Sequence, residues 1–115
     1  MAGLFSKKVA QAVRKIPAGK VATYQQIATA AQSPFAYRAV GNVLFNQYRF
    51  DHTTLPFQSN HPLPCHRVIR KDGHLGGYAA GSAKKRKLLL EEGILIEKNK
   101  INFKLFGISD QTLQK

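Results

Sequence analysis

Hydrophobic residues recur every three or four positions over the first sixteen residues, the spacing of a helix with one buried face. The members of this stripe are Leu4, Phe5, Val9, Ala12, Val13 and Ile16. Pro17 and Gly19 follow, and neither residue favours the continuation of a helix. The pattern predicts a first helix that ends before Pro17.

A capping box marks the start of a second, shorter helix. Thr23 is followed three residues later by Gln26, so each side chain can satisfy a backbone N–H that the first turn leaves unpaired. The helix is expected to begin near Tyr24, to end around Ala31 and to bury its hydrophobic residues, Ile27 and Ala28.

A third helix is expected to start close behind the second. Ser33 is a candidate N-cap, Pro34 a candidate first residue, and the helix should continue through Leu44. Two helices this close together are typical of a helix-turn-helix, although many helical cores contain such a pair, so DNA binding and plain core packing both remain open. Gly41 costs roughly 1 kcal/mol within a helix, which indicates close approach of another backbone, from protein or nucleic acid.

The middle of the chain loses this periodicity. Residues 47–64 mix aromatic and charged side chains and contain three prolines, so a long loop is predicted. Residues 67–70 then predict a short strand and residues 71–73 a tight turn. The segment 76–81 has little side-chain bulk apart from Tyr78, so it can pass close to a ligand or act as a flexible linker.

The last third predicts a helix and a hairpin. Ser82 is a candidate cap for a helix that ends at Gly93, with Leu88, Leu89 and Leu90 facing inward and residues 84–87 mostly facing out. This basic run could contact phosphates or form a solvated face. Residues 94–96 and 101–103 predict two strands joined by a polar turn.

These elements predict an α+β, mostly helical domain. It is expected to be a helix-turn-helix, winged-helix-like domain with short strands around the Pro-Cys-His-Arg motif at residues 64–67 and a small C-terminal hairpin as the wing. With 115 residues, the chain is expected to form one domain, residues 1–115.

Composition limits the class of protein. The one cysteine excludes an internal disulfide and fits a reducing compartment, and one thiol with 4 scattered histidines gives no metal-site spacing. No apolar segment is long enough to span a bilayer, and the N-terminus reaches charged residues too soon for a signal peptide. A cytosolic (nucleoid-associated) or nuclear protein is expected.

Charge points to a polyanionic partner. Lys and Arg number 18 against 6 Asp and Glu, a formal net charge of +12. Because the basic residues are spread along the chain and not gathered on one amphipathic helix, nucleic acid is favoured over a membrane surface. The plainer alternative is a well-solvated surface.

The candidate reactive atom is the sulfur of Cys65, which His66 follows within the segment Pro64-Cys65-His66-Arg67-Val68-Ile69. An ordinary thiol has a pKa of about 8.5, so only a few per cent is thiolate near pH 7 unless the surroundings stabilise the anion. A histidine relay or a helix N-terminus can do so. The alternative is that Cys65 is a small buried hydrophobic residue.

This segment resembles the active-site motif of the O6-alkylguanine-DNA alkyltransferases, or methylated-DNA–protein-cysteine methyltransferases. Residues 19–28 resemble the first helix of that family's helix-turn-helix, and residues 37–41 resemble its recognition helix. The segments 76–78 and 89–93 resemble those that close the alkyl pocket. The resemblance covers most of residues 4–107 in the family's order.

The resemblance implies specific catalytic roles. Cys65 would attack the alkyl carbon on guanine O6 and keep the alkyl group as a stable thioether, in a single turnover without a cofactor. His66 would act as base through a bridging water, and Glu92 would bind the far ring nitrogen of His66. Tyr78 would donate a hydrogen bond to the base.

It also implies a DNA interface. The target nucleotide in double-stranded DNA containing O6-alkylguanine must rotate out of the stack. Arg38 would fill the gap, Tyr24 would press on the backbone phosphate, and the small residues Ala36, Ala39 and Gly41 would let the recognition helix lie in the minor groove. The protein would act as a monomer.

Three departures from the family pattern accompany these roles. The N-terminal domain of larger members is not expected, and Ala79 stands where a serine often follows the pocket tyrosine. Asn46, Gln47 and Asn60 compete for the place of an asparagine before the motif, because the loop 48–61 is longer than usual.

Two other functions remain open. One is an alkyltransferase-like lesion sensor without transfer activity, although such proteins typically have another residue in place of Cys65. The other is a winged-helix regulator in which Cys65 is buried and inert.

Overall fold

The computed structural model describes residues 4–53, 64–78 and 81–114, and for residues 46–53 and 114 it describes the backbone alone. The elements in chain order are α1 (Leu4–Arg14), β1 (Ala22–Thr23), α2 (Tyr24–Ala30), α3 (Tyr37–Thr53), the 3₁₀ helix Cys65–Arg67, β2 (Val68–Ile69), α4 (Ser82–Glu91), β3 (Ile96–Glu97), β4 (Lys100–Ile101), α5 (Phe103–Phe106) and α6 (Asp110–Gln114). Within these described ranges, every helix is too short or too polar to cross a bilayer.

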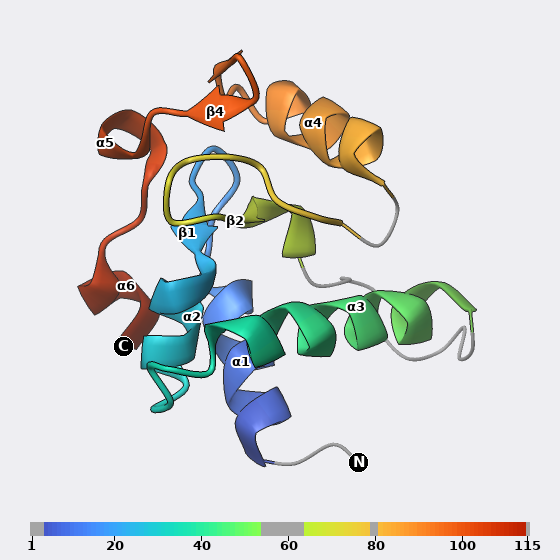
Figure 1. The fold of residues 1–115 in the computed structure, drawn as a ribbon, viewed down its shortest axis with the longest axis vertical. Helices are drawn as coiled ribbons and strands as arrows, with labels where there is room; N and C mark the ends of the chain where they lie inside the picture. Colours follow the sequence, from blue (N-terminus) through green and yellow to red (C-terminus); the bar gives the residue numbers. More distant parts are fainter. Residues whose placement is uncertain (1–3, 54–63, 79–80, 115) are drawn as a thin grey trace.

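A short parallel strand pair lies at the centre of the molecule. Ala22 pairs with Val68 and Thr23 with Ile69, so β1, which leads directly into α2, lies beside the strand that follows Cys65. In Figure 1, α1, α2, α3 and α6 lie below this pair, and α4, α5 and the hairpin of β3 and β4 lie above it.

The hydrophobic core divides in the same way. The larger cluster joins α1, α2 and α3 to Cys65 and Val68. The smaller cluster lies under α4 and the hairpin and includes Ile69 and Leu89. Because β2 contributes Val68 to one cluster and Ile69 to the other, the segment after Cys65 is fixed from both sides.

Most of the predicted elements are confirmed. The capping box is present, with the Gln26 backbone N–H donating to Thr23 Oγ1 (3.0 Å) and the Thr23 N–H donating to Gln26 Oε1 (2.9 Å). The hairpin turn consists of Lys98 and Asn99, both with positive φ (53° and 62°), as a type I′ turn requires. The predicted class, a mostly helical α+β domain with helix-turn-helix and hairpin, is confirmed.

The boundaries of the third helix differ from those predicted. Ser33 does not cap it: its carbonyl accepts from the Ala36 N–H (2.9 Å) in a turn that contains Pro34, and α3 begins only at Tyr37. The loop predicted from residue 47 is wrong as far as residue 53, because no Gly or Pro interrupts α3 there and a helix can continue without hydrophobic periodicity. Residues 54–63 lie outside the described residues, and so does Ala79.

The fourth helix also corrects three expectations. Gly81 (φ 96°), not Ser82, occupies the N-cap position. Leu90 is exposed while Leu89 is fully buried, since consecutive helical residues point in different directions. Lys85, expected to face out, is 0 % exposed because it lies one turn before Leu89 on the same buried stripe.

The short strand also begins later than predicted. Arg67, expected in the strand, belongs to the 3₁₀ helix.

Candidate functional site

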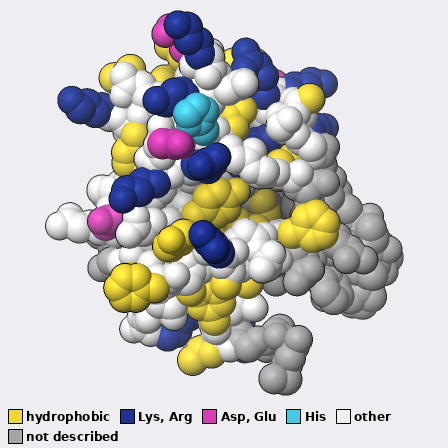
Figure 2. Space-filling model, viewed as in Figure 1, with side chains coloured by type: hydrophobic (Ala, Val, Ile, Leu, Met, Phe, Trp, Pro, Cys, Tyr) yellow, Lys and Arg dark blue, Asp and Glu magenta, His cyan; other side chains and the backbone are white. Residues whose placement is uncertain are grey.

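A cavity of about 1180 Å³ lies between α3 and the segment 70–78. Its wall on the α3 side is formed by Tyr37, Arg38, Gly41, Asn42, Leu44 and Phe45. Figure 2, viewed as in Figure 1, shows hydrophobic side chains around the middle of this face with Lys and Arg side chains among them. The predicted residues Cys65, Tyr24 and Tyr78 complete the wall, so the structure brings five of the predicted site residues to one cavity.

Cys65 is positioned by short elements on either side. It begins the 3₁₀ helix directly after Pro64, and β2 holds the end of that helix against β1. The side chain is 7 % exposed, and its Sγ lies 3.9 Å from the carbonyl oxygen of Leu44 in α3. The thiol therefore lies in the cavity wall beside α3, where only a group that enters the cavity can reach it.

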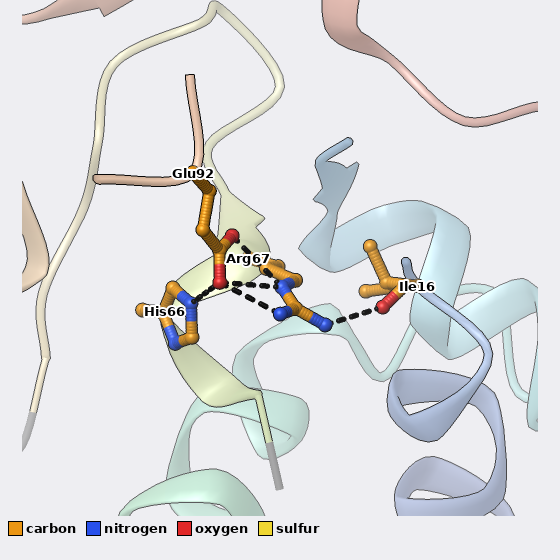
Figure 3. A network of polar contacts seen from close by, with 4 residues as sticks. All are labelled: Ile16, His66, Arg67 and Glu92. Carbon is orange, nitrogen blue, oxygen red and sulfur yellow. Dashed lines mark hydrogen bonds and ion pairs between the residues drawn. The ribbon is translucent and has the colours of Figure 1, made fainter. Parts of the chain in front are cut away.

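A single carboxylate orients the two residues after Cys65. Figure 3 shows Glu92 between the ring of His66 and the guanidinium of Arg67. Glu92 Oε2 lies 2.8 Å from His66 Nε2 and 2.6 Å from Arg67 Nη2, and Arg67 Nε lies 3.0 Å from Oε1. Arg67 Nη1 also donates to the carbonyl of Ile16 (2.7 Å), just beyond α1. The pair predicted between His66 and Glu92 is present, and Arg67 ties it to the helical half of the fold.

The pKa directions of this pair suit proton transfer. Burial lowers the pKa of His66 although the bond to Glu92 opposes the shift, so the imidazole is neutral near pH 7. Burial would raise the pKa of Glu92, but hydrogen bonds from Arg67 and His66 outweigh it and the pKa lies below its usual value. An ionised Glu92 favours the tautomer with the proton on Nε2, which leaves Nδ1 of His66 as the basic nitrogen.

Lys85 is a buried cation that the sequence pattern did not reveal. Its Nζ donates to the carbonyls of Val68 (2.6 Å) and Gly77 (3.1 Å) and lies 5.8 Å from the centre of the Tyr24 ring. These bonds join β2 to the segment before Tyr78. Burial lowers the pKa of Lys85 to about 7, and the charge of Cys65 opposes the shift, so a protonated Lys85 favours the thiolate in return.

Lys85 should make stability depend on pH. Between pH 7 and 10.5 the unfolded chain retains a proton at Lys85 that the folded chain has lost. The free energy of unfolding should therefore rise with pH in this window, by at most about 1.4 kcal/mol per pH unit from this group. Urea unfolding at several pH values should show a shallower rise for Lys85→Met than for the exposed neighbour control Lys84→Met. Equal slopes in the two variants would contradict this.

Tyr24 and Tyr78 both line the cavity that contains Cys65. The Tyr24 hydroxyl donates to the Gly77 carbonyl (3.4 Å), and burial, followed by the charge of Cys65, raises the pKa of Tyr24, so it remains a proton donor. Tyr78 packs edge-on against His66 with ring centres 6.5 Å apart. Gly76 has a φ of 74°, and a Cβ there would lie 3.3 Å from the Tyr24 ring, so this segment needs a glycine to pass so closely.

The predicted DNA-binding residues are distributed over one end of α3. Arg38 and Gly41 line the cavity, whereas Ala36 and Ala39 are half-buried and are not among its lining residues. Outside its own helix, no described atom lies within 4 Å of a Cβ built on Gly41. The close approach of another protein backbone, one of the two explanations offered for this glycine, is therefore not seen among the described residues. The candidates Asn46 and Gln47 have no described side chain, and Asn60 lies outside the described residues.

Comparison with known proteins identifies the family. The family model described as "6-O-methylguanine DNA methyltransferase, DNA binding domain" matches residues 4–94. The methylated-DNA–protein-cysteine methyltransferase of Methanosarcina barkeri is 43 % identical over 96 residues, covering 79 % of this chain and 52 % of that protein. The bifunctional transcriptional activator and DNA repair enzyme Ada of Escherichia coli is 39 % identical over 89 residues, 76 % of this chain and 22 % of Ada.

Solved structures show the same fold. S. pombe Atl1, crystallised with damaged DNA containing O6-carboxymethylguanine, has a TM-score of 0.71 at 30 % identity, covering 91 % of this chain and 94 % of Atl1. Mycobacterium tuberculosis OGT in complex with DNA has a TM-score of 0.60 at 30 % identity, covering 96 % of this chain and 56 % of OGT. The chain thus spans about half the length of the curated methyltransferases that it matches. The model of the family's DNA-binding domain matches most of the length of this chain, and the chain therefore belongs to the O6-methylguanine-DNA methyltransferase family.

Proposed function

We propose that this chain repairs alkylated DNA by transferring the alkyl group from guanine O6 to Cys65 in a single turnover. The observation that carries the proposal is the place of Cys65 in a cavity wall, next in sequence to a histidine bound to a carboxylate. The names of the relatives, and the DNA in the crystals of Atl1 and OGT, support double-stranded DNA as the partner.

The reaction is a direct displacement. His66, acting through a bridging water, takes the proton of Cys65, and the thiolate attacks the alkyl carbon. The S–C bond forms as the C–O6 bond breaks, and the electron pair of that bond stays on the guanine. The guanine is the leaving group of this displacement and stays in the DNA. It takes up a proton and so becomes neutral, with Tyr78 as a hydrogen-bond donor to it.

The depth of Cys65 requires base rotation. A thiol that is 7 % exposed in a cavity wall cannot reach a base within the duplex stack. Arg38, on the cavity face of α3, would occupy the place that the guanine leaves, and the ammonium and guanidinium groups of the surface would bind phosphates. Such binding should weaken as salt increases.

The test is to incubate the protein with a duplex containing one O6-methylguanine and to weigh the protein. Transfer replaces the thiol hydrogen by one methyl group, so the protein gains the mass of one CH₂ unit. A single gain of this size, without a second, supports the proposal. An unmodified duplex is the control. Wild-type protein that binds the lesion but gains no mass would contradict transfer.

A lesion sensor without transfer activity is the second candidate. One observation favours it: the similarity to Atl1 covers 94 % of that chain, whereas OGT is matched over 56 % of its length. The presence of Cys65 favours transfer. Tight binding of the O6-methylguanine duplex without a change of mass would support the sensor.

Replacing Arg38 should separate DNA binding from chemistry. Arg38→Ala is expected to weaken binding of the lesion duplex about tenfold or more, because it removes the side chain that fills the vacated place and so offsets part of the cost of rotating the base. Reaction with free O6-benzylguanine, which needs no rotation, should fall much less. Fluorescence anisotropy and intact mass measure the two quantities. Arg14→Ala, which removes the same charge from an exposed position of α1, is the control; equal losses on both substrates would tell against this role.

A further inference from the structure

Phe35 is exposed to an unusual degree for a large hydrophobic residue. It is 92 % exposed, more than any other large hydrophobic side chain in residues 4–45, 64–78 and 81–113, and yet it lines the cavity that contains Cys65. A phenyl ring left in water forgoes the free energy that its burial would yield. A partner that covered the ring would recover this free energy.

The backbone presents Phe35 in a fixed place. The Ser33 N–H donates to the Ala28 carbonyl and the Ala36 N–H donates to the Ser33 carbonyl, both at 2.9 Å, so the turn before α3 is bonded on both sides of Pro34. A phenylalanine on such a turn has only two side-chain torsions left to restrict on binding. The backbone that carries Phe35 is therefore preorganised, and only the ring itself remains to be fixed on binding.

The charges nearby favour nucleic acid as the occupant. Arg38, Arg70 and Lys71 line the same cavity, and Asp72 is the one carboxylate among its described lining residues. The whole chain has a net charge of +12. Aromatic rings beside cations are the surface on which unpaired bases stack while phosphates bind the cations. Figure 2 shows this mixture of hydrophobic and basic side chains on one face.

We propose that Phe35 is a wedge that stacks on a nucleobase exposed when the target guanine rotates out of the duplex. Arg38 lies three residues further along, at the start of α3, and lines the same cavity, so ring and guanidinium would both act on the opened stack. Apolar wedges of this kind open base steps from the minor groove. The inference rests on the proposed function in one respect, that this face binds DNA.

The chain contains no tryptophan, so Phe35→Trp creates a single fluorescent probe at the wedge. Adding the O6-methylguanine duplex should quench that fluorescence, because an indole stacked on a base loses emission. Leu95→Trp is the matched control: Leu95 is 71 % exposed and is not among the cavity-lining residues, so its probe should keep its emission. Quenching in both variants, or in neither while anisotropy shows a complex, would overturn the wedge.

Affinity gives a second readout. Phe35→Ala should weaken binding of the same duplex on the order of tenfold, whereas Phe35→Trp should bind as tightly as wild type. Leu95→Ala should bind like wild type. Unchanged affinity of Phe35→Ala would overturn the inference and leave the proposed function intact, whereas a wild-type chain that binds no DNA would end both. If sedimentation shows wild type to self-associate and Phe35→Ala not, the ring is covered by a second copy and the wedge is wrong.

Discussion

Cys65→Ala is expected to abolish alkyl transfer completely. No other thiol exists in the chain, so without Sγ the cavity wall has no thiolate to attack the alkyl carbon. After incubation with the O6-methylguanine duplex, intact mass should show no increment. Lesion binding should remain near the wild-type value, because Arg38 and the basic surface are unchanged.

Cys65→Ser is the closer control for shape. It retains a side chain of similar size, but a hydroxyl is a far weaker acid than a thiol and stays protonated near neutral pH. The serine variant should therefore also gain no mass. If either variant still acquired a methyl group, the acceptor would be a different residue and the role given to Cys65 would be wrong.

Glu92→Gln is expected to slow transfer on the order of 100-fold or more, the usual contribution of an oriented general base. The neutral amide would keep the size of the side chain but could neither stabilise the imidazolium that forms nor hold one tautomer of His66. Single-turnover mass spectrometry measures this rate. Glu91→Gln is the matched control, since Glu91 is the exposed neighbour in α4.

The pH profile shows whether Glu92 acts through His66. Transfer by wild type should fall as pH drops through the lowered pKa of His66, below 6.5, where the imidazole becomes protonated. Because the Glu92 charge raises the pKa of His66 against burial, Glu92→Gln should move this acid limb to still lower pH. A purely structural role would lower the rate without moving the limb.

The sequence predicts those parts of the fold that local chemistry determines. Thr23 and Gln26 form the predicted capping box. The predicted hydrophobic stripe of the first helix is buried at Val9, Ala12 and Val13, whereas Leu4, at the start of α1, is 67 % exposed. Residue adjacency alone left open whether Cys65 is reactive or a buried hydrophobic residue, and the prediction that it is reactive came from the resemblance across several segments. The pairing of His66 with Glu92, 26 positions apart, which the resemblance also implied, is present.

The remaining features depend on tertiary contacts. A lysine in a basic run gives no local sign that its Nζ will bond the carbonyls of Val68 and Gly77, and the same is true of Arg67 and the Ile16 carbonyl. A hydrophobic residue at position 35 predicts burial, whereas the ring is exposed. The end of α3 was missed because periodicity reports burial, not helix continuity.

The strand pair β1 and β2 has a consequence for how this protein can change. Thr23 is both the partner of Ile69 and the cap of α2, so the strand after Cys65 and the helix pair α2 and α3 are joined through one backbone unit. Substitutions in this unit would disturb the proposed alkyl transfer and the proposed DNA binding together. Natural variation or engineering that alters only the choice of lesion should therefore concentrate on outward positions of α3, which can vary without shifting the sulfur.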